Sequence, residues 1–242
     1  MVQRPQLGLF ALSVDVRGDL SKQQITGLLQ TLRRVRTPAT LSLPSPGAHE
    51  LVSRALVEPL QHDFAILADP SWASQQAGRT KFARELARRV NVATSNGIDV
   101  RTLALDDTEL TGNLDLLVKH RISIVRSHSQ AGFQPQSLRF GIWQAPVSFS
   151  LPSASRWSLV GVEWAVSRAL SKAAKARDLV HIVTDANALS DPSVYSTLDR
   201  ILTLVQKRQA KGQITAVTLG GLVDSLTPQR RKQASRSVLR VA

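Results

Sequence analysis

The sequence contains no cysteine among its 242 residues, and aromatic residues make up only 5% of it. The absence of cysteine excludes disulfides, thiolate metal sites and a cysteine nucleophile. No apolar run approaches the roughly 20 residues needed to cross a bilayer. The apolar run 7–12 is short and is soon followed by Asp15 and Arg17, so we expect no signal peptide. These features together predict a cytoplasmic protein with no transmembrane segment.

Several familiar catalytic and nucleotide-binding motifs are also missing. The sequence contains no Gly-x-Ser-x-Gly elbow, no Walker loop and no His-Glu-x-x-His helix. A Gly-x-Gly-x-x-Gly turn does not follow the first apolar run, which argues against a dinucleotide-binding sheet.

Basic residues outnumber acidic ones, at 31 Lys and Arg against 18 Asp and Glu, for a net charge of +13. Such a charge favours nucleic acid, anionic glycans or acidic lipid surfaces as partners. The basic residues are spread over expected helices and are most frequent in the segment 229–242, and aromatic residues are not interleaved with them. This distribution is typical of solvated helix faces plus a basic tail, and nucleic acid stays an alternative partner.

The hydrophobic pattern alternates between strand-like runs and helical spacing. The clearest strand-like runs are 7–16, 39–43, 64–68, 99–105, 122–125, 180–183 and 214–219, and shorter extended segments are expected at 138–143 and 147–151. Strand and helix alternate about seven times with short loops, as parallel strands covered by helices require. We predict an α/β fold, a (β/α) barrel of about seven strands over residues 1–228, followed by a basic C-terminal tail at 229–242. An open doubly wound sheet is the alternative.

Polar residues follow many of the expected strands. Chemistry in such barrels gathers where the strands end, so these residues are candidates for one shared site. They are Asp15, Asp69, Asp106, Asp107, Arg126, His128, Trp143, His181 and Asp185. A carboxylate and an imidazole can act as general base and acid, which suits Asp15 and His181. We predict substrate contacts for Arg126, His128, Trp143 and Asp69.

Each candidate also has a structural interpretation. Carboxylates that precede turns or helices, as Asp15 and Asp69 do, often cap backbone amides. His181 lies between apolar Val180 and Ile182, where a histidine is commonly a core residue. Trp143 suits packing as well as it suits a sugar platform.

The order of these segments resembles the polysaccharide deacetylase family, which has the NodB-homology fold. The segment 12–18 (Leu-Ser-Val-Asp-Val-Arg-Gly) stands where the family has Thr-Phe-Asp-Asp-Gly, and 36–41 is similar to its Pro-Ala-Thr-Phe strand. Segment 96–100 is similar to the lead-in of its metal-binding segment. Segment 180–183 resembles the strand with a catalytic His, and 214–219 with Leu222 resembles its closing strand and helix.

The resemblance implies metal-assisted hydrolysis of an acetamide or ester on a sugar polymer. By position, Asp15 matches the base, His181 matches the catalytic His, and Arg126 falls near the family's Arg-Pro segment. The metal-binding residues are mostly absent, because Val16 replaces an Asp and the family's His pair falls on Leu103 and Asp107. Asp107 is then the only matching ligand.

Three hypotheses follow from these residues. The first is a degenerate enzyme without a bound metal, which binds a glycan at the strand ends. The second is an active carbohydrate deacetylase with a remodelled site, either metal-free or with a divalent ion such as zinc held by Asp69, Asp107 and His128. The third is a protein that binds nucleic acid through its basic surface.

Overall fold

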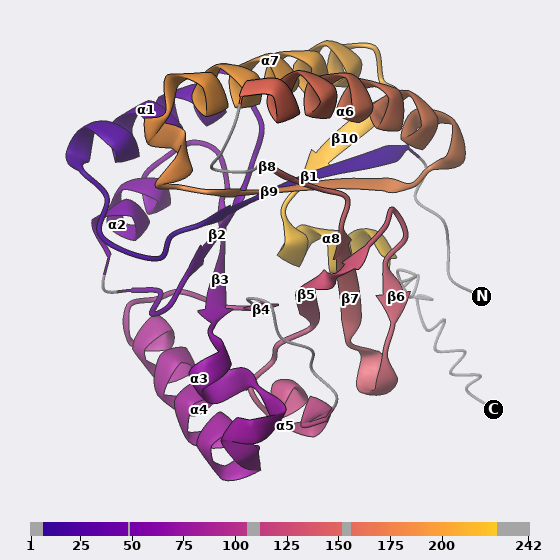
Figure 1. The fold of residues 1–242 in the computed structure, drawn as a ribbon. Helices are drawn as coiled ribbons and strands as arrows, with labels where there is room; N and C mark the ends of the chain where they lie inside the picture. Colours follow the sequence, from indigo (N-terminus) through magenta and orange to yellow (C-terminus); the bar gives the residue numbers. More distant parts are fainter. Residues whose placement is uncertain (1–6, 48, 106–111, 152–155, 227–242) are drawn as a thin grey trace, which may run out of the picture.

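The computed structural model describes residues 7–47, 49–105, 112–151 and 156–226. Its strands form one curled sheet with helices against its outer side (Figure 1). The strands are β1 (Gly8–Asp15), β2 (Thr40–Leu43), β3 (Asp63–Ala68), β4 (Thr102–Leu105), β5 (Ile124–Ala131), β6 (Gln136–Ser137), β7 (Trp143–Val147), β8 (Phe149–Leu151), β9 (Leu179–Asp185) and β10 (Ile214–Val217). The helices are α1 (Lys22–Arg34), α2 (Glu50–Leu56), α3 (Pro70–Ala73), α4 (Gly78–Ser95), α5 (Leu114–Lys119), α6 (Arg156–Ala176), α7 (Pro192–Ala210) and α8 (Leu219–Leu226).

The sheet follows the order β6-β7-β5-β4-β3-β2-β1-β9-β8, with β10 also paired to β1. Among the described strands all pairings are parallel except that of β6 with β7. The sheet has ten strands, more than the seven predicted, because residues 136–151 divide into three short ones.

A single stretch of chain closes the barrel. β7 pairs with β5 at one end of the sheet, and β8 pairs with β9 at the other, with only Ser148 between β7 and β8. Ser148 donates its amide hydrogen to the His181 carbonyl (N···O 2.9 Å), and its hydroxyl accepts from the His181 amide (3.0 Å). The predicted barrel-like α/β fold is therefore confirmed, and the open sheet is not observed.

Alternation along β1 places apolar side chains on the outer face of the sheet and small or polar ones, from Ala11 to Asp15, on the inner face. In β1, Phe10, Leu12 and Val14 belong to the main core that the helices cover. Helix α1 begins with a capping box, in which Ser21 accepts from the Gln24 amide, and it buries one apolar stripe against this core.

The inner face of the barrel is apolar at the end where the strands begin. Leu9, Ile124 and Trp143 form a cluster there with Leu219, Leu222 and Leu226 of α8. The first amides of α8 are capped by inner side chains of other strands, because Leu219 donates to Thr40 Oγ1 and Gly220 to Asp63 Oδ2, each at 2.8 Å. Helix α8 thus forms a floor beneath the polar residues of the site.

Candidate functional site

The centre of the inner face holds a buried ion pair between β1 and β5. Arg126 donates from Nη1 to Asp15 Oδ1 at 2.5 Å and from Nη2 to Asp15 Oδ2 at 2.8 Å. The side chains are 0% and 2% exposed, respectively. Two parallel charge-assisted bonds fix both the position and the orientation of the carboxylate. Asp15 is therefore a carboxylate that is held by a guanidinium below the surface.

His181 lies on the same inner face, one strand away. In the parallel pairing of β1 with β9, Ala11 stands opposite His181 and Asp15 opposite Asp185. The His181 side chain is therefore on the same face of the sheet as Ser13 and Asp15. His181 Nδ1 is 2.8 Å from the Pro146 carbonyl, and Nε2 is 2.8 Å from Ser13 Oγ. Since a carbonyl can only accept, Nδ1 carries a hydrogen, and in the neutral ring Nε2 then accepts from the Ser13 hydroxyl.

This hydroxyl–imidazole pair is completely enclosed. Ser13 and His181 are each 0% exposed. A serine within hydrogen-bond distance of an imidazole is the arrangement that activates a nucleophile, but a substrate must be able to reach it. The burial of both groups favours a role in fixing β1, β9 and the end of β7.

The rim above this layer carries a second, more exposed ion pair. Asp185 stands opposite Asp15 in the β1–β9 pairing, and its Oδ2 is 3.3 Å from Arg17 Nε. The side chains of Arg17 and Asp185 are 47% and 30% exposed. Asp185 also accepts from the Asn187 amide at 2.8 Å. The rim therefore offers a guanidinium and a carboxylate to a ligand approaching the strand ends.

Asp69 follows β3 and caps α3. Its Oδ1 accepts the Ser71 amide at 2.9 Å, which is the structural role that its position before Pro70 allows. Burial raises the pKa of the Asp69 carboxyl, but hydrogen bonds from Ser71 and Trp72 and the charge of Arg89 together leave this pKa below its ordinary value. Asp69 is thus a structural cap, and its predicted contact with substrate stays a prediction.

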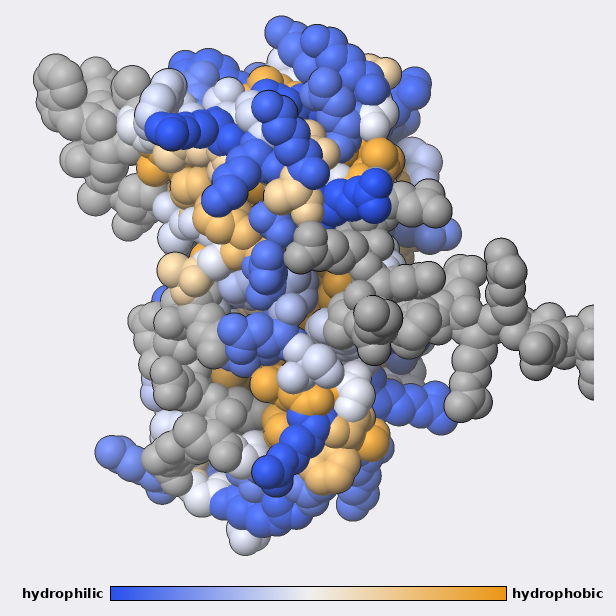
Figure 2. Space-filling view, turned by 90° about the vertical axis from the view of Figure 1, so that its right-hand side faces the viewer, coloured by the Kyte–Doolittle hydropathy of each residue, from blue (hydrophilic) through white to orange (hydrophobic). Residues whose placement is uncertain are grey.

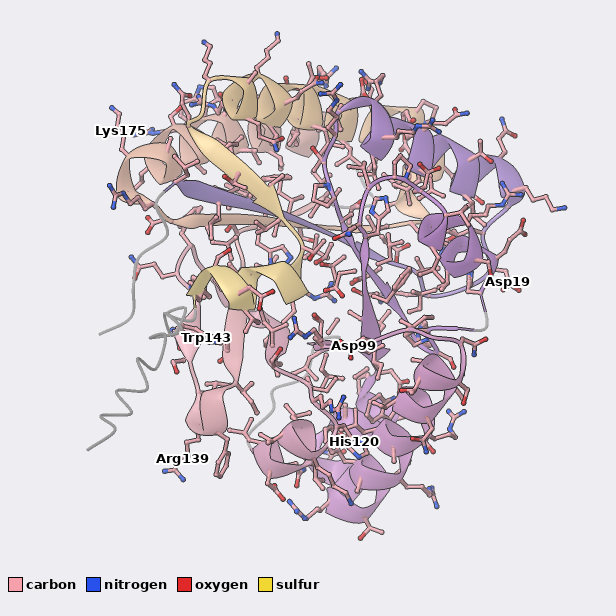
Figure 3. The ribbon with its side chains drawn as sticks, turned by 180° about the vertical axis from the view of Figure 1, so that it is seen from behind. Asp19, Asp99, His120, Arg139, Trp143 and Lys175 are labelled. Carbon is pink, nitrogen blue, oxygen red and sulfur yellow. The ribbon has the colours of Figure 1, made fainter. Side chains whose placement is uncertain are left out.

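Trp143 lies at the opposite end of the barrel from Asp15. It begins β7, is 8% exposed and packs in the cluster that α8 covers. Figure 3 shows it beside α8, away from Asp19, which follows the end of β1. The structure does not bring Trp143 to the group of Asp15, Arg126 and His181, and a sugar contact by Trp143 stays a prediction.

Three predicted residues cannot be placed in this site. Asp106 and Asp107 lie outside the described residues, and the side chain of His128 is not described. The strand position of His128, two residues after Arg126 in β5, follows the predicted order.

Two of the residues that stand at the family's metal-ligand positions, Val16 and Leu103, cannot bind a metal. Val16 is 1% exposed and Leu103 is 0% exposed, and both pack in the apolar core on the outer side of the sheet. Within the described part of the chain, no group of three or more His, Cys, Asp or Glu side chains could hold an ion. Asp15, the carboxylate that matches the family's general base, is bound by Arg126.

Sequence reasoning did not identify Ser13. The signal that could have found it is the alternation Ala11, Ser13, Asp15, which places small and polar side chains on one face of an otherwise apolar strand. Thr40, Ser42 and Thr102, all 0% exposed, continue this signal on neighbouring strands.

Comparison with solved structures shows the same fold in polysaccharide deacetylases. The chain superimposes on a probable polysaccharide deacetylase from Pseudomonas aeruginosa PAO1 with a TM-score of 0.70 and 9% identity, over 90% of each chain. It is also similar to a family 4 carbohydrate esterase from Streptomyces lividans in complex with acetate (TM-score 0.54, 14% identity, 86% of this chain and 91% of that chain). A pseudoenzyme of carbohydrate esterase family 4 from Bacillus anthracis gives a TM-score of 0.51 at 11% identity, over 93% of this chain and 68% of that chain.

The chain therefore has the NodB-like polysaccharide deacetylase fold, as the sequence resemblance predicts. No family model matches the sequence, and no curated protein matches it either. The similar structures include proteins named as a deacetylase or an esterase and one named as a pseudoenzyme, so the fold alone does not decide activity.

The hydropathy of the surface and of the helices bears on possible partners. The face shown in Figure 2 is largely hydrophilic, with hydrophobic residues gathered towards its top and its bottom. Among residues 7–47, 49–105, 112–151 and 156–226, no helix combines the length and apolarity that a membrane crossing needs.

Proposed function

We propose that this protein binds a carbohydrate at the end of the barrel where the strands finish, and that it has lost metal-assisted deacetylation. The observation that carries the proposal is the bidentate pairing of Arg126 with Asp15. A general base must reach the proton that it removes, and the buried guanidinium occupies a lone pair on each oxygen of this carboxylate and fixes its orientation. The apolar side chains at positions 16 and 103 support the same proposal.

The carbohydrate contacts would come from the rim. Arg17 and Asp185 are partly exposed above the buried layer, and they provide donors and an acceptor suited to sugar hydroxyls. Asp15 and Arg126 would position the rim through β1 and β5. The relatives that carry the names polysaccharide deacetylase and carbohydrate esterase support a glycan as the ligand class.

A binding experiment with matched variants tests the proposal. Isothermal titration of acetylated oligosaccharides into the purified protein should give saturable binding that is unchanged by a chelator. Arg17→Ala should weaken binding about threefold to tenfold, as expected for an exposed charged contact. The control is Arg33→Ala, an exposed arginine in the last turn of α1 that pairs with Glu58.

A second candidate is an active hydrolase with a remodelled site. It is favoured by one observation: Asp15 and His181 lie on the same inner face, as a base and an acid would. This candidate predicts release of acetate that is lost in His181→Ala while the fold persists. Equal sugar affinity in wild type and Arg17→Ala, together with such turnover, would contradict the binding proposal.

A further inference from the structure

A groove on the outer side of the barrel carries an exposed tryptophan. Trp164 of α6 is 66% exposed, which is unusual for a side chain of this size. It lines a cavity of about 610 Å³ between α6 and α7, the two helices seen side by side at the top of Figure 1. The other lining residues are Glu163, Ser167, Arg200, Thr203, Leu204 and Lys207. We call this the α6–α7 groove.

The two helices run parallel, so the groove lies along both of them, over their middle turns. Arg200 donates to Glu163 (Nε···Oε2 2.7 Å), and Arg208 donates to Ser171 (Nη2···Oγ 2.6 Å). The second pair lies eight residues beyond the first on both helices. Both helices start after strands that end at the rim, α6 after β8 and α7 after β9. Residues 200 to 207 span about 10 Å along the axis, enough for a short run of sugar rings.

The chemistry of the groove combines a flat apolar surface with hydroxyl-reading groups. The Trp164 side chain is two-thirds exposed, and Arg168 lies over its ring with the guanidinium carbon 5.5 Å from the ring centroid. Ser167, Thr203 and Glu163 provide hydroxyls and a carboxylate along the wall. An aromatic face with adjacent acceptors and donors suits a pyranose ring, whose faces are apolar and whose edge carries hydroxyls.

The charge of the groove selects among sugar polymers. Glu163 is paired with Arg200, which leaves Lys207 as the remaining charge among the lining residues, and Arg168 beside the Trp164 ring adds a second positive charge. Lys207 is exposed at the far end of the groove. These groups complement carboxylate substituents on a polymer.

The same residues argue against nucleic acid in this groove. Successive bases require several stacking surfaces, and among the side chains that the structure describes, Trp164 is the only aromatic one lining this cavity.

We propose that the α6–α7 groove is a second glycan-binding site, and that it takes a polysaccharide bearing carboxylate groups. This inference rests on the proposed function, because it extends the ligand from the rim along the outside of the barrel. It assigns stacking to Trp164 and contact with the carboxylates to Lys207.

The test is affinity electrophoresis of the full chain through gels containing polygalacturonate, with the neutral polymer xylan for comparison. Trp164→Ala should weaken retardation by polygalacturonate about tenfold in apparent Kd. Lys207→Gln should weaken it about threefold, and should leave retardation by xylan unchanged. The matched controls are Phe140→Ala, a side chain 67% exposed on another face, and Lys119→Gln on α5.

The outcomes separate the groove from the rim. If Trp164→Ala is retarded like wild type while Arg17→Ala is not, the groove inference is overturned and the rim proposal stands. If Trp164→Ala loses retardation and Arg17→Ala keeps it, the groove inference holds and the rim proposal fails. Loss of binding to single-stranded DNA, but not to polygalacturonate, in Trp164→Ala would overturn the inference in favour of nucleic acid.

Discussion

Arg126 holds Asp15 by two hydrogen bonds of 2.5 and 2.8 Å across the interior of the barrel. The two residues are 111 positions apart in sequence, and both are enclosed. This ion pair links the fold to the proposed loss of deacetylation. The contact that joins β1 to β5 also binds Asp15, the carboxylate at the position of the family's general base.

Removing one partner of this pair should be costly. Arg126→Met leaves a buried, uncompensated carboxylate, and we expect the free energy of unfolding to fall by about 3–5 kcal/mol. Urea denaturation measures this change. The double variant Arg126→Met with Asp15→Leu should recover most of the loss, because no charge is left unpaired. Arg34→Ala, which breaks the partly exposed pair with Asp199, should cost less than about 1 kcal/mol.

An aspartate restored at position 16 should not create a metal site. Val16 is 1% exposed in the main core, so Val16→Asp buries a carboxyl among apolar side chains and should cost several kcal/mol of stability. Thermal unfolding and zinc titration check both effects. Val57→Asp is the control, since Val57 is 82% exposed and its substitution should change stability by less than about 0.5 kcal/mol. Stoichiometric zinc bound by folded Val16→Asp would show that this position can face the site.

Gly220 should be required for the floor of the barrel. A Cβ added there would lie 2.7 Å from Asp63 Oδ2, which accepts the Gly220 amide, so Gly220→Ala must displace the cap of α8. We expect a loss of about 1–3 kcal/mol, as for an unmade buried hydrogen bond. Gly221→Ala is the matched control, because its Cβ would approach only the Thr218 hydroxyl, at 3.2 Å. Equal melting temperatures for the two variants would contradict this account of the floor.

Asp63 should make stability depend on pH. Burial raises the pKa of its carboxyl from 3.8 to about 6, and hydrogen bonds from Gly220, Phe64 and Thr102 oppose part of this rise. The folded pKa exceeds the unfolded one, so the folded state binds more protons between these values. The contribution of Asp63 is therefore complete below pH 4 and is lost as pH rises through 6, by about 3 kcal/mol.

The measurement is the difference in unfolding free energy between wild type and Asp63→Asn from pH 4 to 8. This difference should fall as pH rises to about 6 and then stay constant. His62 contributes the opposite slope, because burial lowers its pKa, but it is present in both proteins and largely cancels. A difference that increases with pH would show that the carboxylate is stabilised in the folded state.

Local pattern predicted the strands and helices that alternate strongly, and cross-strand contacts explain what it missed. The run 7–16 contains β1, and the helical spacing after Ser21 contains α1. Both elements have a hydrophobic pattern that can be recognised within the segment itself. Residues 136–151 read as two extended segments, but they form three short strands, because β7 and β8 pair with opposite ends of the sheet.

The site was predictable as a set of strand ends but not as a set of contacts. The sequence predicts Arg126 just after the fifth strand-like run, whereas it lies inside the longer strand β5, and only the closed barrel shows that it reaches Asp15. His181 was predicted as either catalytic or structural, and its bonds to Ser13 and Pro146 depend on residues more than 30 positions away. These contacts form only when the barrel closes. The hydrophobic pattern of one segment does not show which distant residues closure brings together.

Release of acetate is the most direct test of the proposed loss of deacetylation. Purified protein would be incubated with acetylated oligosaccharides, with and without added zinc, alongside an active family 4 carbohydrate esterase. The account predicts no acetate above background in either condition, although the same sugars bind. Zinc-dependent acetate release by wild type that disappears in Asp15→Asn would contradict it.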